Sequence, residues 1–164
     1  MTRSSRRIGA LGAATVAAVA FATVAPAAAA PAADGFEFTL YAKEVPGGGG
    51  GPGAQPKPGD SFAFADDLFR TKGGDKAGRD GVSCTVVRAG DPVDVLCVGT
   101  FVLNGGPGGQ LTAQTLLTAD PSNEAQAAFD IAVTGGTGDF KDARGWIRST
   151  PDGDYSRMEF HLTR

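Results

Sequence analysis

The sequence predicts an all-β fold, an eight-stranded antiparallel β-barrel. Short stretches of alternating apolar and polar residues recur from residue 35 onward, separated by clusters of Gly, Pro, Asp and Asn. No stretch between them has the 3.6-residue periodicity of a convincing amphipathic helix. Eight such strands can close on themselves, which removes exposed sheet edges and leaves room for one small ligand. The pattern therefore favours a barrel over a sandwich of two sheets.

The first 30 residues have the layout of a secretory signal peptide. Three arginines lead into an apolar, alanine-rich run over residues 8–24, and small residues with A-x-A frames crowd residues 25–33. The run is short and poor in large side chains for an uncleaved membrane anchor. We therefore expect cleavage between residues 28 and 33 and a secreted, extracellular protein. The Arg6-Arg7 pair leaves twin-arginine export open beside the general route.

Residues 35–164 are expected to form a single β-barrel domain behind a disordered N-terminus over residues 31–34. Once three arginines leave with the signal peptide, 12 of the 15 basic residues remain against 18 acidic ones, a formal charge of −6. Nucleic acids and anionic membranes bind proteins through clustered basic residues. The acidic balance argues against both as partners, and we expect no stable membrane insertion.

The strands follow from the alternation along the chain. Residues 35–41 form the first, and residues 60–69 the second, in which the even-numbered residues from Phe62 to Leu68 share one face. Between them, residues 45–59 hold five consecutive glycines and four prolines, which predicts a flexible loop because glycine loosens the backbone and proline removes ladder donors. The remaining strands are expected at residues 80–88, 93–103, 110–117, 129–133, 142–148 and 155–162.

Cys84 and Cys97, the two cysteines of the sequence, lie in neighbouring β-rich stretches joined by a turn over residues 89–92. If Arg88 faces Val93 across this hairpin, Cys84 faces Cys97 on the same side of the sheet. An exported chain meets an oxidising environment, so we expect a disulfide, with a reactive thiol as the alternative. Closing so short a loop contributes about 3 kcal/mol on the chain-entropy model.

Residues 132–146, AVTGGTGDFKDARGW, contain the glycine-rich segment Gly135–Gly138. A dinucleotide-binding turn would follow the first strand and open a helix, whereas this segment lies late in the chain and leads into another strand. We interpret it as a bend between two barrel strands, because successive glycines permit a sharp change of direction. Phe140 is expected to tuck under the bend, and Arg144 to project from the next strand.

The same segment, Ile131–Phe140 followed by Ala143-Arg144-Gly145, resembles the hallmark of the allene oxide cyclase and dirigent barrel superfamily. Gly59–Phe69 is similar to the "GD…F…L" second strand of that group, and the Ser83-Cys84 strand and Gly109–Gln114 have counterparts in the same order. The match spans nearly all of the predicted domain and is nearest to a secreted bacterial branch. It implies a calycin-type barrel with an apolar central cavity and no cofactor. It also implies a homo-oligomer, since plant members are often trimers.

The resemblance carries over to a few individual residues. Allene oxide cyclases close a fatty-acid epoxide, and an Asn of their second strand helps hold an active-site water; Asp66 stands at that place, while Ala63 replaces the Pro of the motif. Dirigent proteins steer the coupling or cyclisation of phenolic intermediates, and their Asp-Asp pair matches Asp66 and Asp67. The cyclase strand cysteine matches Cys84, and Arg144 matches the Arg of the "ARG" element.

Four residues are candidates for catalysis. Asp66 is the first, because a carboxyl group among apolar side chains has its charged form disfavoured, so that its pKa rises and it can donate a proton. If the neighbouring phenylalanines face outward instead, Asp66 is a group of an interface or of the barrel rim. The others are Asp67, Arg144 and Glu44, and Glu44 is either an acid at the cavity mouth or a solvated loop residue.

The aromatic residues expected to line the cavity, or to form ordinary core, are Tyr41, Phe64, Phe101 and Phe129. His161, the single histidine, is expected on the outer face of its strand. One histidine and two paired cysteines supply no metal-ligand set, so we expect no metal.

These observations predict a secreted barrel that binds a small hydrophobic or aromatic ligand and steers a cofactor-free cyclisation or coupling. As an enzyme it would be a cofactor-independent isomerase or cyclase. The alternative is a non-catalytic exported module that binds a ligand or associates with the cell envelope. A secreted hydrolase would need a Ser-His pair at His161.

Overall fold

The computed structural model describes residues 35–47, 51–53, 55–106, 108–119 and 127–163. The expected signal peptide and N-terminus, residues 1–34, lie outside this part, as do residues 48–50 and 54 of the expected flexible loop. Those predictions therefore stay untested.

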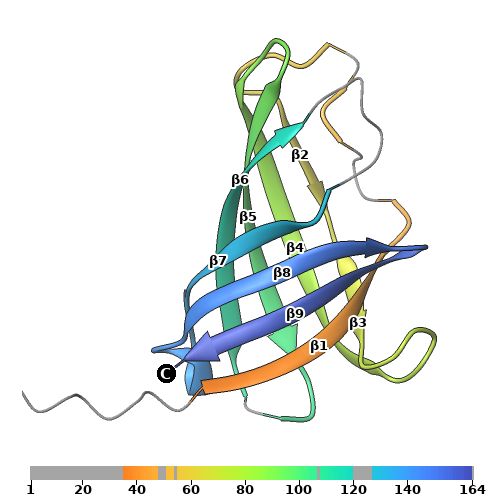
Figure 1. Cartoon of the computed structure of the whole chain (residues 1–164), viewed down its shortest axis with the longest axis vertical. Helices are drawn as coiled ribbons and strands as arrows, with labels where there is room; N and C mark the ends of the chain where they lie inside the picture. The colour runs from red at the N-terminus through yellow and green to blue at the C-terminus, as the bar shows by residue number, and fades with distance from the viewer. Residues whose placement is uncertain (1–34, 48–50, 54, 107, 120–126, 164) are drawn as a thin grey trace, which may run out of the picture. The chain divides into compact units, whose positions relative to one another are not determined.

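Nine β-strands and one short 3₁₀-helix form the described part of the chain (Figure 1). Inward and outward side chains alternate along much of each strand, as the sequence pattern predicts, and the alternation is interrupted where the register shifts. The elements are β1 (Gly35–Glu44), β2 (Ser61–Phe64), β3 (Asp66–Phe69), β4 (Lys76–Arg88), β5 (Val93–Leu103), β6 (Gln110–Ala119), β7 (Phe129–Gly136), the 3₁₀-helix η1 (Gly138–Phe140), β8 (Arg144–Asp152) and β9 (Tyr155–Thr163).

The strands close into a ring in the order β4-β3-β1-β9-β8-β7-β6-β5, and antiparallel pairing of β5 with β4 completes it. β2 and β3 pair with different parts of β4 and are separated only by Ala65. The Ala65 carbonyl oxygen accepts a hydrogen bond of 2.9 Å from the Val45 N–H, just beyond the end of β1. β2 and β3 are thus two parts of one strand, and the predicted eight-stranded antiparallel barrel is confirmed.

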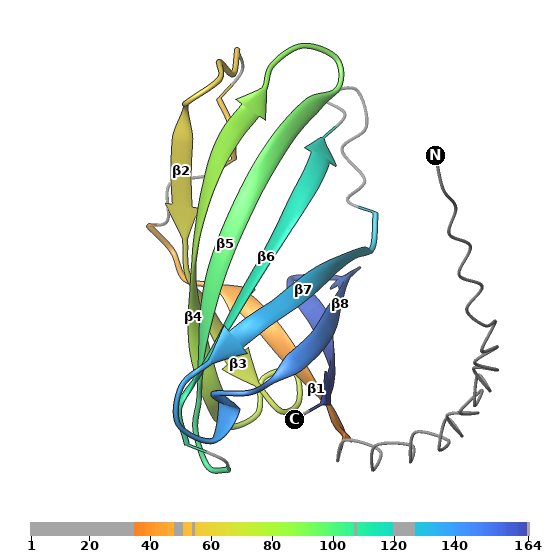
Figure 2. The same cartoon turned by 90° about the vertical axis from the view of Figure 1, so that its left-hand side faces the viewer.

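An open sheet made of β2 and the ends of β4, β5 and β6 extends the ring on one side (Figure 2). β5 and β6 pair from Val93–Ala119 to Val102–Gln110, whereas β6 pairs with β7 only over Leu111–Gln114. β3 pairs with β1 only as far as Asp66, opposite Glu44. The ring is therefore closed over one part of its length, and a four-stranded sheet continues beyond it.

Two clusters of inward-facing side chains occupy these regions. The barrel cluster lies inside the ring, where Phe160 stacks on Phe38 with ring centroids 4.5 Å apart and meets Phe101 edge-on at 5.6 Å. The sheet cluster lies on the open sheet around the two cysteines. The barrel cluster consists of Leu40, Ala42, Leu68, Ala77, Phe101, Leu111, Ala113, Val133, Phe140, Ala143, Ile147, Met158, Phe160 and Leu162. The sheet cluster consists of Cys84, Val86, Val93, Val95 and Cys97, with Phe62, Phe64, Val82 and Leu117 packed against it.

The predicted disulfide is present between Cys84 and Cys97, which face each other across β4 and β5. One detail of the predicted register is wrong: Arg88 faces Asp94 instead of Val93. The pairing shifts between Val86 and Arg88, and this bulge brings Arg88 opposite Asp94. The two side chains form an ion pair, in which Arg88 Nε lies 2.8 Å from Asp94 Oδ2.

The glycine-rich segment is a bend, as predicted. It leads from β7 through η1 into β8, and Phe140 is buried beneath it at 1% exposure. Gly138 has a φ of +60°, and a Cβ on it would lie 2.5 Å from the carbonyl oxygen of Gly108. The segment therefore needs glycine for backbone packing, and the antiparallel barrel around it excludes a dinucleotide-binding fold.

Candidate functional site

Two carboxyl groups meet on the inner face where the ring passes into the open sheet. Asp66 is the first residue of β3, and Asp80 lies on β4, on the same face as Val82. The Asp66 N–H, which β4 does not bind at this interruption, donates a hydrogen bond of 3.0 Å to Asp80 Oδ1. We call Asp66 and Asp80 the carboxyl pair. It lies between the two apolar clusters, since Phe64 on one side belongs to the sheet cluster and Leu68 on the other to the barrel cluster.

Asp80 is the more deeply buried member. Its exposure is 4%, and its Oδ2 atom has no hydrogen-bond partner among the described residues. Burial, followed by the charge of Asp66, raises the pKa of Asp80 from 3.8 to about 8. At pH 7 the neutral acid is therefore the main form of Asp80, and it holds a proton inside the protein.

Asp66 is only half-buried and is the more exposed member of the pair. Burial raises the pKa of Asp66 as well, and the charges of Glu44 and Asp67 act in the same direction. A half-buried carboxyl group with a raised pKa keeps its proton to a higher pH than an ordinary aspartate does, so it can serve as a proton donor. Chemically, the pair is thus suited to general acid–base work on a bound molecule.

The structure brings two of the other predicted catalytic residues close to the pair, and their surroundings differ. Glu44 sits opposite Asp66 across β1 and β3 and is exposed at the end of its strand. Asp67 points to the outer face, where its Oδ1 lies 2.5 Å from Lys76 Nζ. Glu44 is therefore placed to act electrostatically on Asp66, while Asp67 lies in a surface ion pair.

Arg144 is not brought to the carboxyl pair. It begins β8 opposite Thr163, which pairs with Gly35, whereas Asp66 pairs with Glu44 at the other end of β1. Nine residues of strand separate these two positions, roughly 30 Å at 3.3 Å per residue. The guanidinium instead donates a hydrogen bond of 2.8 Å to the Ala143 carbonyl oxygen.

The four aromatic residues predicted to line the cavity have different positions. Tyr41 lies on the outer face, where Lys72 Nζ is 5.9 Å from its ring centroid. Its neighbours Leu40 and Ala42 face inward, so the alternation of side chains along β1 contradicts the prediction for Tyr41. Phe101 is core, at 2% exposure. Phe64 packs against the sheet cluster, and Phe129 is half-buried at the start of β7.

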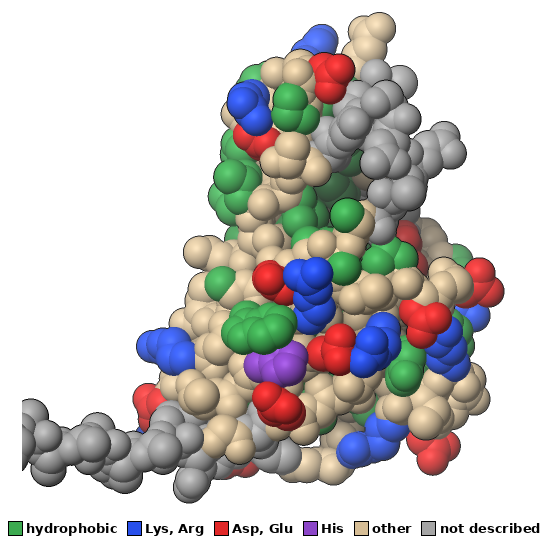
Figure 3. Space-filling view, in the orientation of Figure 1, with side chains coloured by type: hydrophobic (Ala, Val, Ile, Leu, Met, Phe, Trp, Pro, Cys, Tyr) green, Lys and Arg blue, Asp and Glu red, His purple; other side chains and the backbone are tan. Residues whose placement is uncertain are grey.

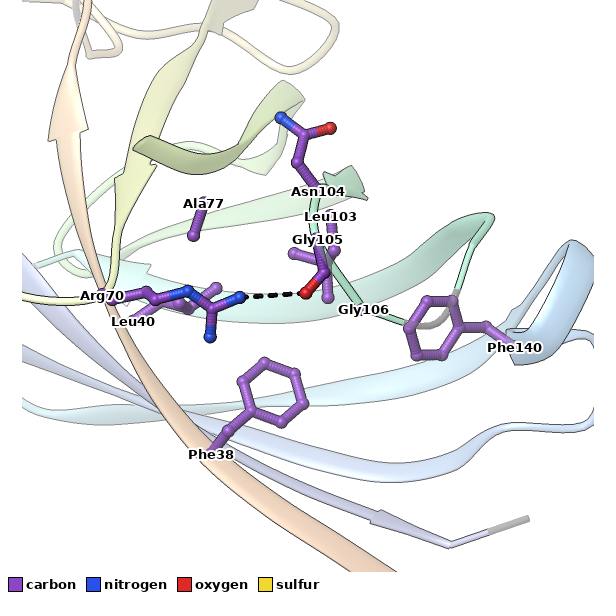
Figure 4. A pocket seen from close by; sticks show the side chains of 9 residues that line it. All are labelled: Phe38, Leu40, Arg70, Ala77, Leu103, Asn104, Gly105, Gly106 and Phe140. Atoms are coloured by element: carbon purple, nitrogen blue, oxygen red, sulfur yellow. Dashed lines mark hydrogen bonds between the residues drawn. The ribbon is translucent and has the colours of Figure 1, made fainter. Parts of the chain in front are cut away.

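A pocket of about 230 Å³ opens at the end of the ring away from the open sheet (Figure 4). We call it the end pocket. None of the four predicted aromatic residues lines it. Its lining residues are Phe38, Leu40, Arg70, Ala77, Leu103, Asn104, Gly105, Gly106 and Phe140.

Asp80 is the functional residue that the sequence reasoning missed. The signal was available, because the disulfide register places Cys84 on the inner face, and the alternation of β4 then puts Val82 and Asp80 on that face too. An acidic residue at an inward strand position is rare enough to be noticed.

His161 lies on the outer face, as predicted. Its ring stacks on that of Trp146 with centroids 4.0 Å apart, and its Nδ1 lies 2.9 Å from Glu37 Oε1. Figure 3 shows the histidine (purple) on the surface between a large hydrophobic side chain and an acidic one. The side chain of His161 therefore lies outside the barrel, where it contacts Trp146 and Glu37.

In the described segments, no three His, Cys, Asp or Glu side chains are grouped so that they could hold a metal ion. Nor is any helix in those segments long and apolar enough to cross a membrane.

The chain matches no protein-family model, and no curated protein matches its sequence. Several solved structures are similar, among them a demethylase and a dirigent protein. Pyocyanin demethylase has 25% sequence identity and a TM-score of 0.61, and the match covers 78% of this chain and 100% of that one. The pterocarpan synthase dirigent protein GePTS1 has 16% identity and a TM-score of 0.58, with 88% and 96% covered. The likeness to GePTS1 shows a shared barrel fold and confirms, at the level of fold, the predicted resemblance to dirigent-like proteins.

Proposed function

We propose that this dirigent-like barrel binds a small apolar or aromatic molecule beside Asp66 and exchanges protons with it through the carboxyl pair. One observation carries the proposal: two adjacent inward-facing carboxyl groups, one of them buried with an unpartnered oxygen, lie between two apolar clusters. An acid in such a position costs stability, and perturbed acids of this kind are concentrated at functional sites.

The chemistry that suits the pair is an isomerisation in which Asp66 donates a proton to the ligand and later accepts one from the product. Asp66 in its acid form protonates an oxygen of the ligand, and a bond within the ligand then forms or shifts. A proton leaves the product for the Asp66 carboxylate, so the protein ends as it began. Asp80 would serve as the positioning residue: its Oδ1 holds the Asp66 backbone, and its proton keeps a second negative charge away from Asp66.

The comparison with pyocyanin demethylase supports a small aromatic ligand. That protein is named for a reaction on pyocyanin, an aromatic molecule, and its whole length matches this chain at 25% identity. The apolar surface next to Asp66 agrees with such a ligand, since Phe62 and Phe64 on β2 are only partly buried.

We also propose that the protein works outside the cell after removal of its first 30 or so residues. The supporting observations are the basic, alanine-rich leader and the disulfide between Cys84 and Cys97. Disulfides of this kind persist in oxidising compartments.

A second candidate function is binding without catalysis, by an exported or envelope-associated module. It is favoured by the filled centre of the ring, where Leu68, Leu111 and Phe160 are each at 0% exposure. A ligand would then rest at an end of the barrel and not pass into its centre.

The two candidates are separated by binding and turnover measurements on the same protein. The folded, disulfide-bonded protein is dialysed against pyocyanin and a panel of phenols, and products are followed by mass spectrometry. We expect one of these probes to bind and to be converted. Asp66→Asn should keep the binding but lose about 100-fold or more in rate. The matched control is Asp142→Asn, which removes an exposed carboxylate.

Binding without conversion in the wild type would establish the non-catalytic alternative. Equal rates in wild type and Asp66→Asn would remove Asp66 from the mechanism. If none of the probes binds, the proposed ligand class is wrong.

A further inference from the structure

The end pocket combines apolar walls with a single cationic side chain. Phe38 and Leu40 line it from β1, Leu103 from β5 and Phe140 from η1, and Arg70 lines it from the segment that follows β3. We propose that the end pocket is a second binding site, which takes a small amphiphilic carboxylate with its apolar body in the pocket and its carboxylate on Arg70.

The position of Arg70 is fixed by the fold. It directly follows β3, and its Nη2 donates a hydrogen bond of 3.2 Å to the carbonyl oxygen of Gly105, in the segment that leaves β5. Figure 4 shows the side chain reaching over the pocket towards Gly105, with the rings of Phe38 and Phe140 on the side away from Ala77. The cation is thereby held beside the apolar walls and does not point away from them.

The charge of Arg70 has no countercharge in the described part of the chain, since none of the ion pairs there includes it. A guanidinium carries five N–H donors in a planar fork, and the bond to Gly105 uses one of them. Such a fork binds a carboxylate through two parallel hydrogen bonds. The ligand group that this corner of the pocket lacks is therefore an anion, and a planar one fits best.

The size of the end pocket limits the apolar part of the ligand. An apolar cavity of about 150 Å³ admits benzene, and drug-sized ligands occupy about 300–1,000 Å³. At about 230 Å³ the pocket lies between these values. It suits a small ring system or a short alkyl chain.

The end pocket is separate from the carboxyl pair. Ala77, in its wall, precedes Asp80 by three residues on β4, about 10 Å at 3.3 Å per residue. Leu68, at 0% exposure, follows Asp66 by two residues on β3 and fills the inner face between them. This site therefore does not depend on the proposed function, and Arg70 variants should leave proton transfer at Asp66 unchanged.

The test measures binding of octanoate and benzoate to the folded protein by calorimetry, with octanol as the neutral probe. Octanoate represents a fatty acid and benzoate an aromatic acid, so the two arms distinguish the sources of the same chemistry. Arg70→Gln should weaken binding of the acid that fits by about tenfold or more, as expected for loss of a charge-assisted hydrogen-bond pair. Octanol binding should not change.

Two further variants test the location of the site. Arg79→Gln removes another exposed arginine, from the outer face of β4, and should bind the acids as the wild type does. Ala77→Met narrows the pocket and should weaken the acid and octanol alike, whereas Ala63→Met, on an exposed position of β2, should change neither. Amide NMR shifts at Gly105 and Gly106 should report the binding.

Failure of both acids to bind would overturn the proposal, and so would equal affinity of Arg70→Gln and the wild type for the acid that binds. Loss of binding in Arg79→Gln to the same extent would also overturn it, because a general charge effect would then explain the result. Binding of only one acid supports the proposal and identifies the class.

Discussion

Replacement of Asp80 by asparagine should make the protein more stable, and only above acidic pH. Asparagine keeps the shape of the side chain and an Oδ1 acceptor for the Asp66 N–H, and it removes the ionisable group. The variant therefore separates the hydrogen bond at the β2–β3 interruption from the cost of burying a carboxyl group at 4% exposure.

The sign and size follow from the raised pKa. The pKa of Asp80 rises from 3.8 to about 8 through burial and the charge of Asp66. The folded state thus keeps a proton on Asp80 that the unfolded state releases. The contribution of this proton to the unfolding free energy is fully present below about pH 4 and is lost as the pH rises to about 8. A pKa difference of about four, at ~1.4 kcal/mol for each step of one, sets an upper limit of ~6 kcal/mol on the stability that Asp80 loses. This is large beside the total unfolding free energy of a typical protein, about 5–15 kcal/mol.

The assay is urea unfolding at pH 4, 6 and 8 with the disulfide intact. The difference in unfolding free energy between Asp80→Asn and the wild type should be near zero at pH 4 and reach several kcal/mol at pH 8. Asp94→Asn is a control of opposite sign, because hydrogen bonds from Arg88 and Thr118 lower the pKa of Asp94. It should be the less stable protein at neutral pH and match the wild type in strong acid. Parallel curves for Asp80→Asn and the wild type from pH 4 to 8 would refute the reasoning.

Three stability predictions follow from the packing. The double variant Cys84→Ser/Cys97→Ser should lose about 3 kcal/mol of unfolding free energy, because the bridge closes a loop with a sequence separation of 13; no loss would contradict the chain-entropy estimate. Gly145→Ala should lose more than ~2 kcal/mol, since its φ is +133° and its Cβ would lie 2.0 Å from a carbonyl oxygen of β9, whereas Gly81→Ala has open space and should change little. Phe160→Ala should cost about 3–5 kcal/mol in chemical denaturation, and a cost below 1 kcal/mol would mean that the barrel cluster repacks.

The sequence predicts the strand faces well wherever alternation is regular. It places Asp66 on the same face as Phe64 and Leu68, while leaving open whether that face points inward, and it pairs Cys84 with Cys97 across the hairpin. Both inferences use a period of two residues, which strands follow wherever no bulge interrupts them.

The wrong predictions arise where the in–out alternation of strand side chains was not applied or where a bulge interrupts it. Tyr41 was expected to line the cavity or to belong to the core, whereas Leu40 and Ala42 occupy the inner positions of β1. The cross-strand partner of Arg88 is Asp94 and not Val93, because of a bulge that the sequence pattern does not predict.

The carboxyl pair and the end pocket could not be predicted from the sequence for a different reason. Asp80 lies 14 residues from Asp66, and only the pairing of β3 with β4 brings them together. The end pocket gathers Phe38, Arg70, Leu103 and Phe140 from four parts of the chain, two of which lie outside the strands. Residue types alone could not predict which of these side chains meet.

The proton held inside the barrel can be observed directly by NMR titration of the aspartate carboxyl carbons. In protein labelled with ¹³C at aspartate, the Asp80 signal is assigned as the one missing from Asp80→Asn, and its shift is followed from pH 3 to 10. A midpoint near 8 is expected, together with a midpoint for Asp66 above its ordinary value. Midpoints near 3.8 for both Asp80 and Asp66 would show that the carboxyl pair is fully ionised at neutral pH and would contradict the account.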